Sequence, residues 1–214
     1  MQSNDLVRAQ HIPGEIAVDD FDHSAWTLSQ PAFIAQYWSG VPAPVHRHAE
    51  ARLLWSNSAL YARFVCPQEE PLVISSTPQT DAKTLGLWDR DVCEVFLAPN
   101  PSAPNHYFEF EAAPTGEWVD LEIQKNGDQR ETNTVFHSGM AASASIRSQL
   151  VLVALRIPWS ESLPAPKSRE RWRINLFRCV GKDPDRGYVT WRPTFTTEPS
   201  FHAPEAFGWL VFGE

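Results

Sequence analysis

The sequence predicts an all-β protein: a two-sheet antiparallel β-sandwich of the jelly-roll or immunoglobulin-like kind, with about ten or more short strands and little helix. Apolar residues alternate with polar residues in many short segments, which is the period of a half-buried strand. The chain carries 18 Pro, and proline interrupts both helix interiors and central strands, so short elements are favoured. Gly, Pro and Asn stand between the alternating segments, as they do in the loops of sandwiches.

The expected strands follow one another along the chain between residues 51 and 212. The first two flank the polar link 56–59, which has the length of a hairpin loop, and the next two flank a Pro- and Asn-rich loop at 99–105. Helix signals are few, and only Asp22–Leu28 and Pro158–Ser162 are expected to form a turn each. The strands are expected at Ala51–Trp55, Leu60–Cys66, Val92–Ala98, His106–Ala112, Glu117–Ile123, Ala144–Arg147, Leu150–Ile157, Trp172–Val180, Tyr188–Trp191 and Trp209–Phe212.

Length and charge limit the classes of partner. With 214 residues, the chain is expected to form one domain over 1–214. The net charge of −8 and the lack of a Lys and Arg stripe argue against a nucleic-acid partner. No segment approaches the ~20 apolar residues of a membrane span, so no membrane partner is expected. The N-terminal residues have no apolar run of a signal peptide, which favours a cytoplasmic location; the oligomeric state stays open.

The three cysteines, Cys66, Cys93 and Cys179, each lie in an apolar, strand-like segment. None forms a C-x-x-C pair, so the sequence predicts buried, reduced thiols and no zinc site.

The segment 87–97 carries the first candidate binding residues. Trp88, Asp91 and Glu94 lead into an alternating apolar strand. A saccharide offers C–H faces to an indole ring and hydroxyl groups to a carboxylate, so this combination is typical of a sugar site. The alternative is that Trp88 fills the core and the acids are ordinary surface charges.

Alternation along two neighbouring strands brings further acids to the same place. Glu94 lies on the mixed face of its strand, and Tyr107, Glu109 and Glu111 share one face of the next strand. Three close carboxylates repel one another unless solvent, a cation or ligand hydroxyls compensate. A ligand site is therefore one interpretation of Glu109 and Glu111, and a solvated outer face is the other.

Several weak motifs occur in a characteristic order from about Ile16 to Phe212. They are V-D before a Trp (Val18, Asp19, Trp26), then L-Y-A-R-F, W-x-x-D-x-x-E-x-F, Y-F-E-F-E-x-x-P-x-G, I-P-W, W-R-x-N-x-F-R and F-H-x-P-E-x-F-G. This order resembles the family 9 carbohydrate-binding modules and their stand-alone bacterial relatives. The resemblance implies a β-sandwich related to the DOMON domains, which holds a sugar between two aromatic rings, hydrogen-bonded by a carboxylate, without a cofactor. In contrast to the N-terminal sequence, the resemblance favours an extracellular or periplasmic location.

The resemblance also implies roles for individual residues. Trp88 matches the first stacking aromatic residue, Glu94 the carboxylate, and Phe201 the position of the second stacking residue. The chain departs from the family where an arginine, a glutamine and an asparagine are expected, because Glu111, Phe177 and Glu198 stand there. The expected saccharide-binding residues are Trp88, Asp91, Glu94, Glu109, Glu111, Arg178, Phe201 and His202.

These departures leave the ligand class open, because acids in place of arginine and amide donors favour hydroxyl hydrogens, an amine or a metal ion. The resemblance allows calcium, for which Asp81, Asp89 and Asp91 are candidate ligands, although their spacing matches no fixed loop.

Two further functions remain as alternatives. A DOMON-type haem- or metal-binding redox domain would need axial ligands such as Met140 with His46, His48 or His202. The sequence places Met140 in a loop-like segment and the first two histidines in a Pro-rich stretch, so all three are expected at the surface. A glycoside-active enzyme could use Glu94 and Glu109 as acid and base, but a small sandwich is better suited to holding a sugar than to distorting it.

Overall fold

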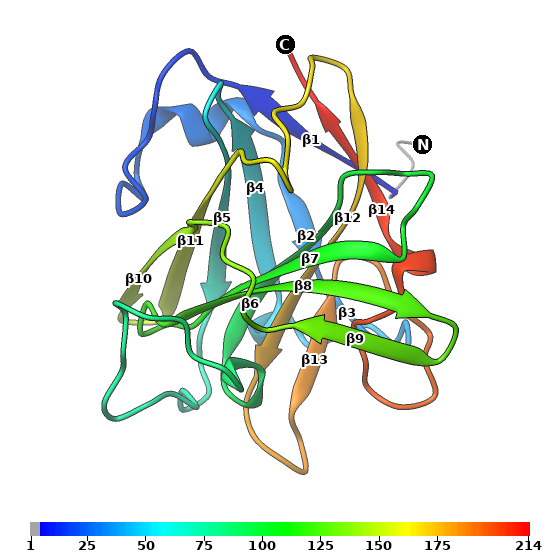
Figure 1. Cartoon of the computed structure of the whole chain (residues 1–214). Helices are drawn as coiled ribbons and strands as arrows, with labels where there is room; N and C mark the ends of the chain where they lie inside the picture. Colours follow the sequence, from blue (N-terminus) through cyan, green and yellow to red (C-terminus); the bar gives the residue numbers. More distant parts are fainter. Residues whose placement is uncertain (1–4) are drawn as a thin grey trace.

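The structure, a computed structural model that describes residues 5–214, confirms the β-sandwich (Figure 1). No helix in this part of the chain is long and apolar enough to cross a membrane. The helical elements described are the 3-10 turns η1 (Ser24–Leu28), η2 (Val45–Arg47), η3 (Leu87–Asp89) and η4 (Pro204–Ala206). The strands are β1 (Leu6–His11), β2 (Ala32–Ile34), β3 (Gln36–Tyr37), β4 (Ala49–Trp55), β5 (Ala59–Pro67), β6 (Val92–Ala98), β7 (His106–Ala112), β8 (Trp118–Asn126), β9 (Gln129–Asn133), β10 (Ala141–Arg147), β11 (Leu150–Pro158), β12 (Arg171–Val180), β13 (Gly187–Thr190) and β14 (Gly208–Phe212).

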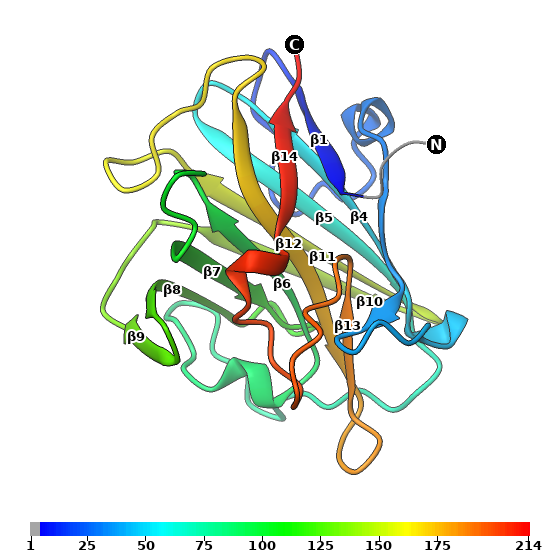
Figure 2. The same ribbon diagram turned by 90° about the vertical axis from the view of Figure 1, so that its right-hand side faces the viewer.

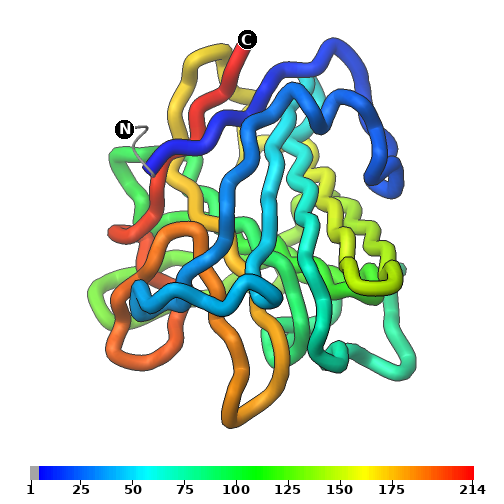
Figure 3. The backbone as a smooth tube through the Cα atoms, turned by 180° about the vertical axis from the view of Figure 1, so that it is seen from behind, coloured from blue at the N-terminus to red at the C-terminus, as the bar shows by residue number. Residues whose placement is uncertain are grey.

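The strands form two sheets that share β1. Sheet A has the order β1-β14-β12-β6-β7-β8-β9, and β13 and β3 continue it beside β12. Sheet B has the order β10-β11-β5-β4, with β1 and β2 both beside β4. Residues 6–9 of β1 pair with β14 and residues 10–11 pair with β4, so β1 passes from one sheet to the other (Figures 1 and 3).

Most strands of the predicted antiparallel sandwich do pair antiparallel, and the exception is β1. This strand runs parallel to both β14 and β4. Parallel neighbours need a long connection between them, and both partners are far from β1 in the sequence.

The main core lies between the two sheets. Val95 and Leu97 of β6 and Phe108 and Phe110 of β7 point into it, and Phe64 of β5 faces them from sheet B; all five are buried. The period of two that the sequence shows along β6 and β7 therefore identifies the inward residues correctly.

The outer face of sheet A is also buried, which contradicts the solvated-face interpretation of Glu109 and Glu111. Leu87 of η3 and the segment 201–207, drawn in red beside β12 in Figure 2, cover this face and join a second apolar cluster. Glu109 is 3% exposed and Glu111 is fully buried at 0%. Sheet A therefore carries apolar layers on both faces, and its outer layer encloses carboxyl groups.

Most of the expected elements are confirmed, among them the turn in Asp22–Leu28, where η1 forms. The turn expected at Pro158–Ser162 is wrong, because β11 extends to Pro158 and no helical turn follows it. Strands β1, β2, β3 and β9 were not predicted. All residues of β9 are polar and exposed, and it pairs only with β8 at the edge of sheet A, where no apolar alternation is required.

The cysteines are buried and free, as predicted. The Sγ atoms of Cys66 and Cys93 lie 3.5 Å apart across the core, and Cys179 lies in the outer cluster of sheet A. Met140 is only 5% exposed and belongs to the main core, so its prediction as a surface residue is wrong. Its burial was not predicted, because the neighbouring Ser138 and Gly139 are typical of a loop.

Candidate functional site

A pocket of about 520 Å³ opens on the outer face of sheet A, between η3 and the segment that precedes η4. We call it the acidic pocket, because Glu94 of β6 and Glu109 of β7 line its floor. Its volume lies in the range of ~300–1,000 Å³ that is usual for small-molecule sites. The residues that line it are Trp88, Asp89, Glu94, Phe96, Glu109, Leu121, Arg130, Thr132, Thr134, Cys179, Tyr188, Pro199, Ser200, Phe201 and His202.

Trp88 is an exposed aromatic residue at the mouth of this pocket. It belongs to η3, which begins after Gly86 in a left-handed conformation (φ 79°) and is anchored by the buried side chain of Leu87. Trp88 itself is 40% exposed, so the interpretation in which it fills the core is wrong. The turn holds an indole where a ligand ring can reach it.

Arg186, in the loop between β12 and β13, holds η3 in place. Its guanidinium group donates hydrogen bonds to the carbonyl oxygens of Trp88 and Arg90, both at 2.6 Å, and to that of Asp89 at 3.2 Å. A fourth bond, to the carbonyl of Gly181, is 3.0 Å long. The sequence analysis missed this residue, because a contact between residues nearly 100 positions apart leaves no local pattern.

Phe201 lies in the wall of the pocket and is 7% exposed. Its ring stacks on Phe177 with a centroid distance of 4.0 Å and an interplanar angle of 10°, and Tyr188 meets it edge-on at 6.0 Å. One face of Phe201 is therefore covered by Phe177. This ring pair makes that part of the wall apolar, so it offers contact area instead of hydrogen bonds.

Two glutamates of the floor, Glu94 and Glu109, have a third, Glu111, beside them on the same pair of strands. In the antiparallel register Glu94 stands directly opposite Glu111, and Phe96 opposite Glu109. One oxygen from each of the three carboxyl groups lies within 4.8 Å of the others. The prediction that alternation brings Glu94, Glu109 and Glu111 together is confirmed, and we call them the glutamate trio.

Burial changes the proton affinity of the trio. Desolvation raises the pKa of Glu94 well above its ordinary value, and the nearby charge of Glu109 raises it further. The pKa of Glu111 is also raised well above 4.5, first by burial and then by Glu94 and Glu109. Burial raises the pKa of Glu109 as well. The Cys179 thiol, 3.4 Å from Glu94 Oε1, is a weak donor to it.

His202 borders the trio as a neutral ring. Its Nδ1 and the hydroxyl group of Tyr107 form a 2.9 Å hydrogen bond, and its Nε2 lies 3.9 Å from Glu109 Oε2. Burial lowers the pKa of His202 to about 3, helped by the charges of Arg130 and Lys125. His202 therefore carries no charge near neutral pH and does not neutralise Glu109.

Two of the expected binding residues lie on the other face of sheet A. Arg178 donates to the carbonyl oxygens of His48 and Pro67 at 2.6 and 2.9 Å, and so fastens β12 to sheet B. The carboxylate of Asp91 accepts from the amide groups of Val73 and Gly181 at 3.3 and 2.8 Å. The placement of both residues in the pocket is wrong, because the period of two sends them to the side opposite Phe177 and Glu94.

The candidate calcium ligands do not form a group. Asp81 is exposed, Asp89 lies at the rim of the acidic pocket, and Asp91 is committed to backbone amides. Among residues 5–214, the acids that come together closely enough for an ion are the glutamate trio.

The two alternative functions find little support in this geometry. Met140 lines neither the acidic pocket nor the hollow described below, so it does not pair with His202 or His46 as a haem ligand. Glu94 and Glu109 lie side by side on one floor, on adjacent strands. A glycosidase needs its two carboxyl groups on either side of the scissile bond.

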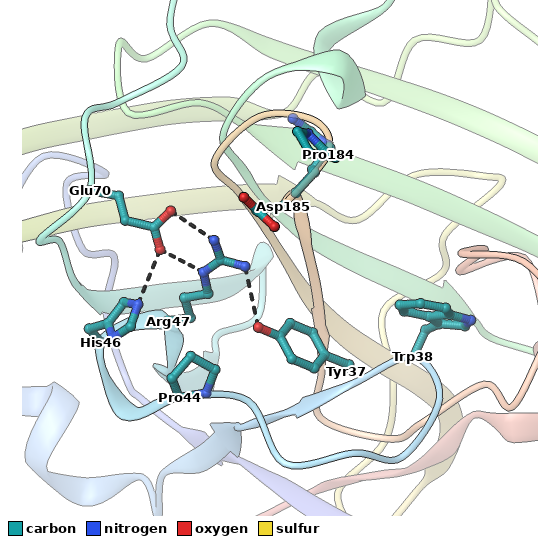
Figure 4. Close-up of a pocket in the computed structure, with 9 residues that line it drawn as sticks. Tyr37, Trp38, Pro44, His46, Arg47, Glu70, Pro184 and Asp185 are labelled. Carbon is teal, nitrogen blue, oxygen red and sulfur yellow. Dashed lines mark hydrogen bonds and ion pairs between the residues drawn. The ribbon is translucent and has the colours of Figure 1, made fainter.

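A second, more open hollow of about 620 Å³ lies beside η2 (Figure 4). Its central polar groups are paired with one another: Arg47 binds Glu70 through Nε at 2.5 Å and through a second nitrogen at 2.9 Å, and it donates to the Tyr37 hydroxyl at 3.2 Å. His46 lies 3.2 Å from the same carboxylate. Because Arg47 and Glu70 already bind each other, this hollow is the weaker candidate, although its volume is larger.

The sequence analysis also missed the side of the acidic pocket formed by β9. Arg130, Thr132 and the following Thr134 line the pocket from there. The local signal that could have revealed this strand is Gly127-Asp128, a two-residue hairpin loop between the paired Asn126 and Gln129, with Gly127 at φ 62°.

The fold and the pocket define a β-sandwich binding module with one aromatic-rimmed ligand pocket. The chain belongs to the carbohydrate family 9 binding domain-like family, whose model matches residues 18–214. A comparison with curated proteins finds no match.

Solved structures share this fold over almost the whole chain. A candidate carbohydrate-binding protein from Bacteroides uniformis is similar with a TM-score of 0.71 at 15% identity, over 97% of this chain and 98% of the other. A family 9 carbohydrate-binding module from Caldicellulosiruptor kristjanssonii in complex with cellotriose has a TM-score of 0.67 at 13% identity, over 97% and 93%. A structure of such a module from the same organism with glucose has a TM-score of 0.63 at 15% identity, over 97% and 96%.

Glu111→Gln should stabilise the protein at neutral and alkaline pH. Folding raises the pKa of Glu111 above 4.5, the ordinary pKa of a glutamate. Above about pH 4.5 the unfolded chain loses this proton while the folded protein keeps it, so the free energy of unfolding falls as the pH rises. The variant should thus unfold at higher urea concentration than the wild type at about pH 8, and the difference should shrink towards about pH 5. Urea unfolding of the variant and the wild type at the two pH values, in the presence of EDTA, measures the difference in stability.

Glu131→Gln is the matched control, since Glu131 is exposed on β9. It should leave stability unchanged at both pH values. A Glu111→Gln variant that is less stable than wild type at about pH 8 would contradict the electrostatic cost assigned to the trio.

Arg186→Met should loosen η3 while leaving the sheets intact. Hydrogen bonds from a charged donor contribute about 1.5–3 kcal/mol each, so their loss should speed local opening by about tenfold or more. Hydrogen exchange of the Asp89 and Arg90 amides should accelerate, with β12 unchanged. Lys182→Met, an exposed cation of the same loop, is the control, and equal exchange in the two variants would rule out the clamp.

Proposed function

We propose that this protein binds the end of a saccharide in the acidic pocket, with a sugar ring against Trp88, Phe201 in the wall, and a hydroxyl group hydrogen-bonded to Glu94. The observation that carries the proposal is the exposed indole of Trp88 above buried carboxyl groups in one pocket. An indole accepts the C–H face of a sugar, and a carboxyl group accepts from its hydroxyls. Membership of the family points to the same ligand class.

A sugar with glucose units is the first ligand to test. The family 9 modules that share this fold were solved with cellotriose and with glucose. The sequence identity to them is low, so the contacts in this chain must come from its own residues.

The pocket of this chain offers mainly hydrogen-bond acceptors and hydroxyl groups. Glu111 and Phe177 stand where the family pattern has arginine and glutamine, which removes donors from the floor and wall. Thr132, Thr134 and Ser200 contribute hydroxyl groups, which both donate and accept. We therefore infer a ligand whose hydroxyl groups act chiefly as donors, as at the non-reducing or reducing end of a neutral sugar.

Trp88→Ala should weaken saccharide binding without unfolding the protein. Burying the ring against a sugar contributes about 25 cal/mol per Å² of apolar surface, or about 2 kcal/mol for the indole, which corresponds to roughly a 30-fold rise in Kd. Isothermal titration with glucose, cellobiose and cellotriose measures the change, and thermal melts verify folding. The fold should survive because the side chain is largely outside both apolar clusters.

Phe33→Ala provides a control for the loss of an exposed aromatic ring. Phe33 is 60% exposed on β2 and does not line the acidic pocket, so this variant should bind as the wild type does. Equal affinity of Trp88→Ala and wild type for the bound sugar would refute the proposed site, and a screen of neutral saccharides without any binding would refute the function.

A further inference from the structure

The glutamate trio is a cluster of three buried carboxyl groups, and the side chains around it supply few hydrogen-bond donors. Neither carboxyl oxygen of Glu111 has a hydrogen-bond donor among the described residues, and the same holds for Glu109 Oε2. Glu111 is 0% exposed, and its carboxyl group lies within 4.8 Å of the other two. A fully buried, unpartnered carboxyl group that points into the cluster is an observation separate from the clustering itself, since most buried polar groups have a partner.

No basic side chain of residues 5–214 forms an ion pair with Glu94 or Glu111. Glu109 lies near His202, which is neutral as described above, and Arg130 is an exposed residue of β9 at the pocket rim. Arg186 directs its guanidinium group to backbone carbonyls. The charges of Arg186 and Arg130 act on Glu94 and Glu109 only at a distance, so no ion pair with a basic side chain of the described residues compensates the trio when it is ionised.

The surroundings of the trio make this lack of compensation costly. The glutamates lie within the outer apolar cluster, between Phe96, Phe177 and Leu121. Like charges directly opposite each other on paired strands destabilise a sheet, and buried charges require a partner or a bound cation. The facing carboxyl groups at the centre of β6 and β7 are therefore suited to binding a cation, which would balance their negative charge when they are ionised.

We propose that the glutamate trio binds a hard divalent metal ion, of the calcium or manganese kind, beneath the acidic pocket. Such ions prefer carboxylate oxygens and take about six to eight ligands in the case of calcium. Three glutamates supply three to six ligand oxygens, because each carboxylate can bind the ion through one or through both of its oxygens. Because Glu94 and Glu109 line the pocket, the remaining positions open towards it, where water or a ligand hydroxyl group can complete the shell.

This site differs from the one suggested by Asp81, Asp89 and Asp91. Its ligands belong to two central strands of sheet A, whose register holds them in place, so little chain ordering is needed on binding. The inference stands apart from the proposed saccharide binding, because no sugar atom is needed to hold the ion.

The test is a metal titration of the whole chain after EDTA treatment and removal of the chelator. Isothermal titration with CaCl₂ and with MnCl₂ should give one site per chain for at least one of the two ions, and that ion should raise the Tm. Glu111→Gln should weaken this affinity at least about tenfold and remove the rise in Tm, while Glu131→Gln should behave as wild type does. Glu109→Gln serves as the second ligand variant if Glu111→Gln does not fold.

Two results would overturn the proposal. One is no heat and no change in Tm with either ion up to about 1 mM, the weak end of protein calcium sites. The other is an unchanged affinity in a folded ligand variant. Saccharide titrations in EDTA are run in parallel to separate the two proposals. If sugar binds and metal does not, only the metal site is refuted. If metal binds and sugar does not, only the proposed saccharide binding is refuted.

Discussion

The register of β6 against β7 is the constraint on which the site depends. It sets Glu94 opposite Glu111 and, through the period of two, turns Val95, Leu97, Phe108 and Phe110 into the main core. A shift of one residue would place the glutamates in the core and the phenylalanines outside. The apolar inner face thus fixes the position of the acids on the outer face.

The outer face owes its chemistry to the cover above it. On an uncovered sheet the three acids would be solvated and of no consequence. Leu87, Phe201 and Phe207 close over them as part of the second apolar cluster, and the low dielectric that results raises their pKa values. Arg186 connects this cover to sheet A, because it lies in the loop that follows β12 and binds the backbone of the turn that carries Trp88.

Local patterns predicted much of this molecule. Alternation identified most of the strands and brought Glu94, Glu109 and Glu111 together, and the ordered motifs indicated the family. The same period of two, applied to Arg178 and Asp91, would have placed them on the opposite face. The burial of Glu109 and Glu111 could not be predicted, because Phe201 and Phe207, which help to cover them, are at least 90 positions away in the sequence. The polar edge strand β9 carries no apolar pattern.

The most direct test of the central claim, that the acidic pocket is the ligand site, is a crystal structure of the protein with cellotriose. The account predicts a sugar ring against the indole of Trp88, with a hydroxyl group within hydrogen-bond distance of Glu94. Saccharide density in the hollow beside η2, or elsewhere on the surface with the acidic pocket left unchanged, would contradict it.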